Sequence, residues 1–211
     1  VQSDAPCPVT VREGRAFLTE WLTDHPARPL PPEEIPPCGE VVLAAEDVWF
    51  KYEEKGPDIV RGLHMTVRQG EFVALLGGNG TGKSTTLRLL SGGLRPYRGT
   101  VRHTGRLGVL PQNPQALFVK KTVREDLFET FDGLHLPLAE QQRRVEQMVT
   151  LCRLTELLDR HPYDLSGGEQ QRAALAKVML LEPDILLMDE PTKGLDAEFK
   201  QSFAAMVRSL L

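Results

Sequence analysis

The feature that most constrains this chain is a glycine-rich stretch at residues 77–84, which reads Gly-Gly-Asn-Gly-Thr-Gly-Lys-Ser. It follows an apolar run, Phe72–Leu76, and precedes a helix predicted over Thr85–Leu90. Glycines tolerate positive φ and carry no Cβ, so several backbone N–H groups can surround one anion. The positive end of the following helix points at the same anion. The stretch therefore predicts a strand, a phosphate-binding loop and a helix within an α/β fold.

The residue types of this loop suit the phosphates of a nucleotide, because they match G-x-x-x-x-G-K-[ST]. Lys83 supplies a point charge between the β- and γ-phosphates, and the Ser84 hydroxyl is placed to ligate Mg²⁺. The alternative is a plain glycine-rich turn, but a chance match is on the order of one per cent. The residues predicted to contact the nucleotide here are Gly77, Gly78, Asn79, Gly80, Thr81, Gly82, Lys83, Ser84 and Thr85.

Two carboxylates, Asp189 and Glu190, follow a second apolar run at Ile185–Met188. Successive strand side chains point to opposite faces, so these two residues are expected to have different tasks. Asp189 is predicted to hold Mg²⁺ beside Ser84, and Glu190 to face the attacking water as general base. The alternative is a polar strand end that leads into a turn. Beside a phosphate loop, the catalytic interpretation is favoured.

A third segment, Leu165–Arg172, opens a predicted helix with Ser-Gly-Gly-Glu. Ser166 and Glu169 have the spacing of a capping box, which explains them structurally. Two glycines in a first turn cost about 1 kcal/mol each relative to alanine, and a cap alone has no use for them. Bare N–H groups at a helix N-terminus suit an anion. Because the first phosphate already has its loop, this end is predicted to serve a nucleotide held by another domain.

The composition limits the classes of protein to which this chain can belong. The chain has 211 residues with 25 Lys and Arg against 29 Asp and Glu, a formal net charge of −4. This size suggests one large domain or one and a half small ones, and the acidic balance argues against nucleic acid as a partner. Apolar runs of about five residues are far shorter than the roughly 20 that span a bilayer. We expect no secretion signal, and three scattered cysteines are typical of reduced cytosolic thiols.

The first 40 residues differ from the rest. Thr10 and Glu13 have capping-box spacing before an apolar helical pattern that includes Phe17 and Trp21, so residues 1–40 are predicted to form an amphipathic segment and a proline-rich linker, Pro26–Pro37. From residue 41 the pattern is α/β. The predicted strands are Val41–Phe50, Ile59–Val67, Phe72–Leu76 and Asp184–Met188, and further helices are predicted within Ala139–Asp159, Gly168–Leu181 and Ala197–Leu211.

From about residue 41 onward, these motifs in this order resemble the ATP-binding-cassette (ABC) ATPase family. The resemblance rests on residues 77–84, 165–170 and 185–190, on Gln112 in Leu-Pro-Gln-Asn-Pro, and on a Gly-Leu-Asp at 194–196. It implies a P-loop NTPase with a RecA-like parallel sheet, an antiparallel β subdomain and a helical subdomain at about 113–165. Tyr52 resembles the aromatic residue that stacks on adenine, the alternative being an ordinary strand tyrosine.

The family resemblance also implies the partners. Two such domains would pair head to tail with ATP and Mg²⁺ between them, and the second domain's nucleotide would meet Ser166, Gly167, Gly168 and Gln170. Gln112 would touch Mg²⁺ or the attacking water, beside the metal residues Ser84 and Asp189. The catalytic set would be Glu190, Lys83 and Gln112. The helical subdomain would bind an integral membrane transport subunit, which places the chain in the cytoplasm, peripheral on the inner face of the cell membrane.

The sequence around Gln112, together with Thr122-Val-Arg-Glu-Asp126 downstream, resembles that of the energy-coupling-factor branch of the family, which takes up cobalt and vitamins. Some ATPases of that branch carry two cassettes, and a Val1 start with a proline-rich linker suits a second cassette. The family places a switch histidine after a further strand. Only 21 residues (211 − 190) follow Glu190, so residues 41–211 are expected to be C-terminally truncated and to lack that histidine. All five histidines lie upstream, at 25, 64, 103, 135 and 161.

The main hypothesis is therefore the ATPase of an importer for a metal ion or a vitamin. Its alternatives are a soluble ABC ATPase not coupled to transport, and a nucleotide-binding fragment without activity. A P-loop kinase or GTPase is disfavoured, because Thr192–Asp196 has one residue too many for [NT]-K-x-D and residues 165–170 would be unexplained. Without the histidine and a partner cassette, slow hydrolysis by the chain alone is expected.

Overall fold

The computed structural model describes residues 7–26 and 39–210, in two units that are treated separately, Val1–Pro37 and Cys38–Leu211. In the first unit, helix α1 (Val11–Asp24) begins at the predicted capping box. The Glu13 N–H donates to the Thr10 hydroxyl over 3.2 Å, and the Thr10 N–H donates back to the Glu13 carboxylate over 3.1 Å. None of the α1 residues is buried within this unit. Apart from Pro26, the predicted linker at 26–37 lies outside the described residues.

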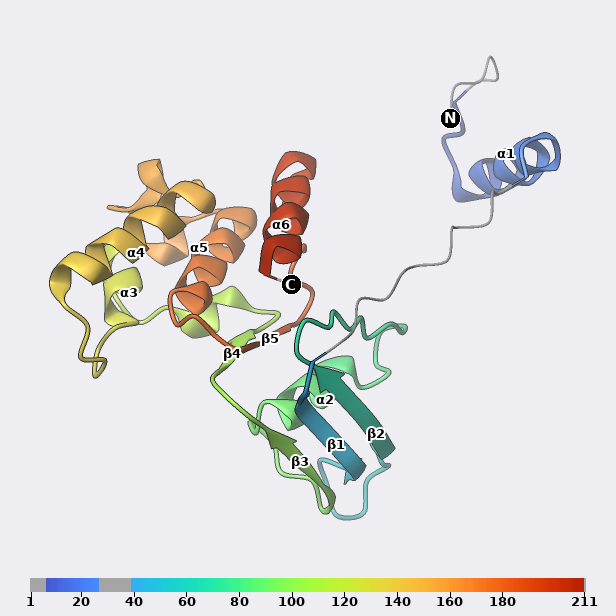
Figure 1. The fold of residues 1–211 in the computed structure, drawn as a ribbon. Coiled ribbons are helices and arrows are strands. Elements are labelled where there is room, and N and C mark those ends of the chain that lie inside the picture. The colour runs from blue at the N-terminus through green and yellow to red at the C-terminus, as the bar shows by residue number, and fades with distance from the viewer. Residues whose placement is uncertain (1–6, 27–38, 211) are drawn as a thin grey trace. The chain divides into compact units, whose positions relative to one another are not determined.

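The second unit opens with an antiparallel sheet of order β2-β1-β3, formed by β1 (Val41–Phe50), β2 (Val60–Arg68) and β3 (Arg98–His103) (Figure 1). The first two strands confirm the prediction to within a residue. The third was not predicted, because only Val101 of its six residues is apolar. Helix α2 (Lys83–Leu90) packs on this sheet, where its last two leucines join a buried cluster with Leu43 and Val48.

A parallel pair, β4 (Leu107–Leu110) and β5 (Ile185–Met188), carries the acidic motif. The pair aligns Leu107 with Ile185 and Leu110 with Met188. The prediction of a strand at Phe72–Leu76 is wrong. Residues 72–78 form no ladder and no hydrogen bond with the backbone of other described residues, and Phe72 and Leu76 are exposed. An apolar run favours burial, but a strand also needs a hydrogen-bonded neighbour, and this segment has none.

The other regular elements of the second unit are helices (Figure 1). They are η1 (Pro114–Leu117), α3 (Val123–Glu129), α4 (Leu138–Leu151), η2 (Thr155–Leu157), η3 (Pro162–Asp164), α5 (Gly167–Met179) and α6 (Ala197–Leu210). The helical prediction for 139–159 is too long, because α4 ends at Leu151 and Arg153 takes a φ of 54° that no α-helix continues through. Leu110, Leu127, Leu154 and Leu175 lie at the centre of the core that joins these helices.

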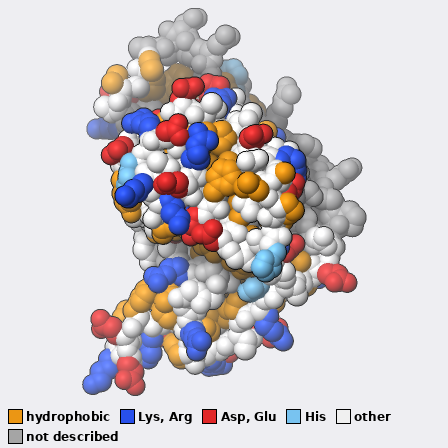
Figure 2. All heavy atoms as spheres, turned by 90° about the vertical axis from the view of Figure 1, so that its left-hand side faces the viewer, with side chains coloured by type: hydrophobic (Ala, Val, Ile, Leu, Met, Phe, Trp, Pro, Cys, Tyr) orange, Lys and Arg blue, Asp and Glu red, His pale blue; other side chains and the backbone are white. Residues whose placement is uncertain are grey.

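The surface of the helical region carries charges of both signs. On the face shown in Figure 2, acidic and basic side chains are intermixed around hydrophobic side chains. Among the described residues, no helix is both long and apolar enough to cross a membrane.

Candidate functional site

The loop at 77–84 has the backbone that its glycines require. Gly80 and Gly82 take φ values of 78° and 90°, in the left-handed region that favours glycine. A Cβ on Gly82 would also lie 3.1 Å from the carbonyl oxygen of Ile59. The Thr81 hydroxyl donates to the Gly78 carbonyl over 2.9 Å and closes the turn. Helix α2 then begins at Lys83, so its first N–H groups open directly onto the loop.

Lys83 lies across this loop. Its ammonium group donates to the carbonyl oxygens of Gly77 and Gly78, both over 2.7 Å. The ammonium therefore lies on the inner side of the turn that the glycines create. Ser84 is the next residue of α2 and is exposed. The predicted phosphate residues thus form one continuous loop and helix start, as their spacing indicated.

Tyr52 lies beyond the end of β1, with a side chain that is 58% exposed. Its hydroxyl shares a hydrogen bond of 3.0 Å with the Thr85 hydroxyl in the first turn of α2, and its ring meets Phe50 edge-on at 5.0 Å. Two fixed contacts thus hold an exposed aromatic ring beside the start of the phosphate-binding helix. This geometry favours the adenine-stacking interpretation over that of an ordinary strand tyrosine.

The acidic pair follows β5 directly. The Asp189 N–H donates to the Leu110 carbonyl over 3.0 Å and extends the parallel pairing by one bond. The backbone at Glu190 then takes a φ of 49°, beyond the end of β5. The direction of the Glu190 side chain therefore comes from this turn of the backbone. The sequence pattern predicts instead that it comes from the alternation of side chains along a strand. The Gln112 amide donates to the Glu190 carboxylate over 2.9 Å, and Lys193 lies 3.2 Å from the same oxygen.

The electrostatics of Glu190 follow from these contacts. The hydrogen bond from Gln112, and after it the one from Lys193, hold the pKa of the Glu190 carboxyl below its ordinary value. Glu190 is therefore ionised at neutral pH and accepts hydrogen bonds only. Gln112 was predicted to touch Mg²⁺ or water. In the structure its amide nitrogen orients Glu190, which leaves the amide oxygen as its remaining acceptor.

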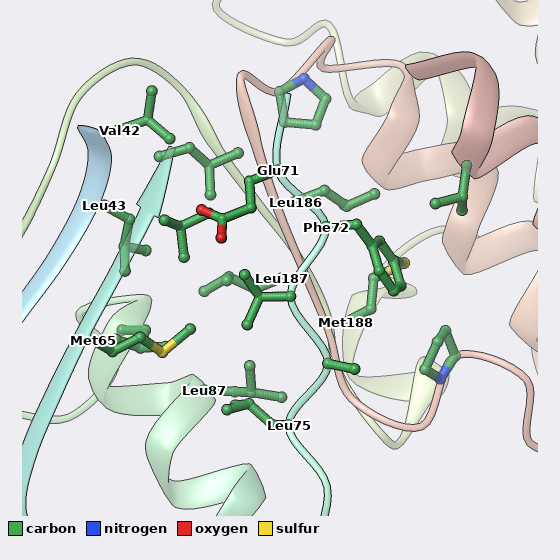
Figure 3. A pocket seen from close by; sticks show the side chains of 18 of the residues that line it. Val42, Leu43, Met65, Glu71, Phe72, Leu75, Leu87, Leu186, Leu187 and Met188 are labelled. Atoms are coloured by element: carbon green, nitrogen blue, oxygen red, sulfur yellow. The ribbon is translucent and has the colours of Figure 1, made fainter. Parts of the chain in front are cut away.

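A cavity of about 490 Å³ brings the two motifs together. Lys83 of the phosphate loop and Asp189 and Glu190 of the acidic motif all line it. Its remaining wall is largely apolar, as Figure 3 shows for Phe72, Leu75, Leu186, Leu187 and Met188, among others. Ser84 is not among the lining residues.

The donor set fits Mg²⁺. Ser84, Gln112 and Asp189 offer a hydroxyl, an amide and a carboxylate oxygen, and Mg²⁺ is usually bound through one or two carboxylates together with waters and substrate phosphates. Within the described residues, no group of three or more His, Cys, Asp or Glu forms a cage that would hold a metal ion. A site that relies on the phosphates of a nucleotide is consistent with both observations.

The N-terminus of α5 has the predicted cap. The Glu169 carboxylate accepts from both the N–H and the hydroxyl of Ser166, at 2.7 Å each, and these bonds lower the pKa of Glu169. A Cβ on Gly167 would meet nothing within 4 Å, so this end of the helix is open. A Cβ on Gly168 would lie 2.6 Å from the carbonyl oxygen of Gly194. Gly168 is therefore needed for a close approach of two backbones.

Gln170 is a correction to the predicted set. It is 6% exposed, and its amide donates to the Pro162 carbonyl and accepts from Gln115. A side chain turned inward and satisfied in this way is not available to a nucleotide. Conversely, sequence reasoning missed Lys193, which pairs with Glu190. The one hint of this pairing in the sequence is that Lys193 lies three residues after Glu190.

The family model described as ABC transporter matches residues 60–193, which include the phosphate loop, Gln112, the capped glycines and the acidic motif. The chain belongs to the ABC transporter family. The P-loop NTPase fold with an antiparallel β part and a helical part is confirmed by its structural neighbours, which are ABC cassettes.

Among the curated relatives, a putative ABC transporter ATP-binding protein of Clostridium tetani is 33% identical over 216 residues, which cover 96% of this chain and 47% of that protein. The energy-coupling factor transporter ATP-binding protein EcfA1 of Geobacillus kaustophilus is 34% identical over 184 residues, 81% of this chain and 66% of the relative. The chain thus spans about half the length of the first of these relatives.

A solved structure of similar fold is cbiO1 of Clostridium perfringens, described as part of the ABC transporter complex cbiONQ. It superposes with a TM-score of 0.69 and 28% identity over 81% of this chain and 75% of its own. The Geobacillus relative and this structure agree with the resemblance to the energy-coupling branch of the family.

Proposed function

We propose that this chain binds Mg²⁺ and ATP, hydrolyses the ATP, and thereby drives an importer. The observation that carries the proposal is the shared cavity, which is lined by Lys83 of the phosphate loop and by Asp189 and Glu190, with Gln112 bonded to Glu190. These residues supply an anion cradle, a carboxylate for a metal ion and an oriented base, which are the parts that phosphoryl transfer to water needs.

Binding is assigned to the loop and to Tyr52. The N–H groups of residues 77–82 and the first turn of α2 surround the phosphates, and the Lys83 ammonium neutralises their charge. The Tyr52 ring stacks on adenine. Its hydroxyl contact with Thr85 fixes the ring relative to the phosphates, so base and triphosphate are held at one spacing.

Hydrolysis is assigned to Glu190. Its carboxylate is ionised, so it accepts a hydrogen bond from the attacking water and takes its proton. The Gln112 amide holds the carboxylate in one orientation, which makes Gln112 a positioning residue. Ser84, Asp189 and the Gln112 oxygen would hold Mg²⁺, which when bound neutralises charge on the phosphates.

The second nucleotide contact is assigned to the capped end of α5, Ser166, Gly167 and Gly168. Because Glu169 occupies the Ser166 hydroxyl and Gly167 faces open space, the free backbone N–H groups of this end are left for a phosphate of a second cassette. We propose that a second ABC cassette, in the same or another polypeptide, pairs with this one and that each ATP lies between the two.

The helical segment 113–165 is the proposed contact with an integral membrane transport subunit, on the cytoplasmic side of the membrane. Relatives named for energy-coupling factor transport and for the cbiONQ complex support an importer whose cargo is a metal ion or a vitamin. The mixed charges of the face in Figure 2 suit a protein partner better than a nucleic acid.

The test uses the full-length protein that contains this chain, with its membrane partner. Wild type is expected to bind and hydrolyse ATP, and Glu190→Gln to keep binding while losing about 100-fold or more in turnover. Tyr52→Ala is expected to weaken ATP but to spare inorganic triphosphate, with Tyr52→Phe as the matched control that keeps the ring. Turnover that survives Glu190→Gln would refute the assignment of the base.

Transport is tested separately, by uptake of labelled cobalt or vitamin into cells that make the wild-type protein or the Glu190→Gln variant. Uptake that requires Glu190 supports the importer. ATP hydrolysis with no uptake of either cargo would favour a soluble ABC ATPase. The purified 211-residue chain alone is expected to hydrolyse ATP slowly, because each ATP is proposed to need a second cassette. Brisk turnover by that chain, lost on Glu190→Gln, would overturn this last expectation.

A further inference from the structure

A buried ion cluster inside the helical region has no place in the site described so far. Lys177, in the last turn of α5, has a side chain that is 12% exposed, and its ammonium group donates to three acceptors. These are the Leu117 carbonyl at 2.7 Å, the Asp126 carboxylate at 2.8 Å and the Glu129 carboxylate at 2.8 Å. An ammonium has three donors, so all of them are used.

The cluster is costly to bury. The Asp126 side chain is 2% exposed, and one of its oxygens has no hydrogen-bond partner among the described residues. Two carboxylates share one ammonium, so the cluster has an excess negative charge. Apolar residues of similar volume would fill such a space with equal or better stability. The presence of charged residues here therefore indicates that they hold neighbouring segments in fixed positions.

The groups that accept hydrogen bonds in this cluster show which segment of the chain it holds. Leu117 ends η1, which begins two residues after Gln112, and Asp126 also accepts from the N–H of Val119 over 3.0 Å. The segment that follows the Gln112 loop is thus tied to Lys177 both directly and through Asp126. A second tie lies nearer the start of α5, where the Gln115 amide donates to Gln170 over 3.3 Å.

The other end of α5 is Ser166–Gly168. Because α5 is one continuous helix over Gly167–Met179, a displacement of the segment at 114–119 is carried by these ties to its glycine end. Gln112 orients Glu190 in one nucleotide site, and the glycines face the proposed second site. The cluster therefore links the Gln112 loop to Ser166–Gly168, and these two parts of the chain are proposed to act on different nucleotides.

We propose that Lys177 is a positioning residue for ATP hydrolysis, which locks α5 to residues 114–119 so that the Gln112 loop and Ser166–Gly168 move as one body. This inference rests on the proposed function, because the glycine end has a task only if two cassettes share ATP. Lys177 itself touches no nucleotide. Its removal is expected to spare binding at the phosphate loop and to impair the steps that need both cassettes.

The experiment compares Lys177→Met with Lys177→Arg and with Lys200→Met, an exposed lysine of α6, in the full-length protein. Three quantities are measured: affinity for ATP by calorimetry, ATP-driven pairing of cassettes in the Glu190→Gln background, and turnover. Lys177→Met is expected to bind ATP within about twofold of wild type, to lose ATP-driven pairing and to lose about ten- to a hundredfold in turnover, since small displacements in a composite site have effects of that size. Lys177→Arg is expected to restore most of the turnover, and Lys200→Met to change nothing.

A second variant separates positioning from folding. Lys177→Met with Asp126→Leu removes the ammonium and the more buried carboxylate, leaves Glu129, which is 30% exposed, and is expected to recover thermal stability. Low turnover in this stable double variant supports positioning, whereas recovery of turnover together with stability would overturn it. Turnover of Lys177→Met within twofold of wild type would also overturn it. Failure of the wild type to bind or hydrolyse ATP would instead refute the proposed function.

Discussion

The contact between Gly168 and Gly194 offers a sharp test of the packing around the acidic motif. A Cβ at position 168 would lie 2.6 Å from the Gly194 carbonyl oxygen, whereas one at position 167 would meet nothing within 4 Å. Both positions are in the first turn of α5, so Gly167→Ala and Gly168→Ala carry the same change in helix propensity. The difference between the two variants isolates the cost of the close approach.

The magnitude follows from the distance. Ordinary van der Waals contact begins near 3.4 Å, so the helix start and the loop at Gly194 must separate by about 0.8 Å to admit the methyl group. The obstacle is backbone, which cannot rotate away as a flexible side chain does. Overpacking of this kind costs about 1–3 kcal/mol. For a unit of this size, about 2 kcal/mol corresponds to a fall in Tm of about 4–8 °C.

The assay is thermal unfolding followed by circular dichroism, with the two alanine variants measured side by side. Gly167→Ala is expected to unfold at or slightly above the wild-type temperature, and Gly168→Ala several degrees below it. Equal Tm values for the two variants would show that the helix start and the loop separate at no cost, and would refute the reasoning.

Three further predictions concern single side chains. Lys83→Ala should weaken ATP binding about 10- to 150-fold in calorimetry, because a charge-assisted contact of about 1.5–3 kcal/mol is lost, while Lys200→Ala leaves it unchanged; equal affinities would contradict the loop assignment. Burial raises the pKa of the Cys152 thiol to about 12, so at pH 8 a thiol reagent should label the exposed Cys7 and spare Cys152 until the chain unfolds, as peptide mass mapping would show. Hydrogen bonds from Arg143 and Arg144 on α4 lower the pKa of Glu140 to about 2, below its value in the unfolded chain. The contribution of Glu140 to stability is therefore present above pH 4.5 and is lost as the pH falls toward 2. The gap in urea midpoint between wild type and Glu140→Gln should therefore narrow from pH 6 to pH 3, and a constant gap would exclude this pairing.

Local chemistry made much of the site predictable. The loop at 77–84 follows from glycines with positive φ, and the caps at Thr10 and Ser166 follow from side chains that bond three residues away. Each of these features depends on a few neighbouring residues, so sequence spacing alone specifies it. The same reasoning singled out Tyr52, which is exposed, and Glu190, which accepts a hydrogen bond from Gln112, and the tasks of both residues stay predictions.

Features that depend on distant partners were predicted less well. The segment Phe72–Leu76 has the apolar composition of a buried strand, but pairing is decided by a neighbour that its sequence does not contain. Strand β3 pairs with β1 although it has little apolar content. Gln170 shows the converse, because a motif position was predicted to face a nucleotide while its tertiary partners, Pro162 and Gln115, turn it inward.

The unpaired segment at 72–76 has a consequence for how the phosphate loop is supported. On one side the loop continues into α2, whose hydrogen bonds and buried leucines anchor it. On the other side it continues from a chain whose amides have no backbone acceptor among the described residues. Amide hydrogens of residues 72–76 should therefore exchange with solvent far faster than those of β1. A phosphate bound by the N–H groups of residues 77–82 would restrain the end of that chain directly, so slower exchange at 72–76 on ATP addition would report how far binding orders the segment that leads into the loop.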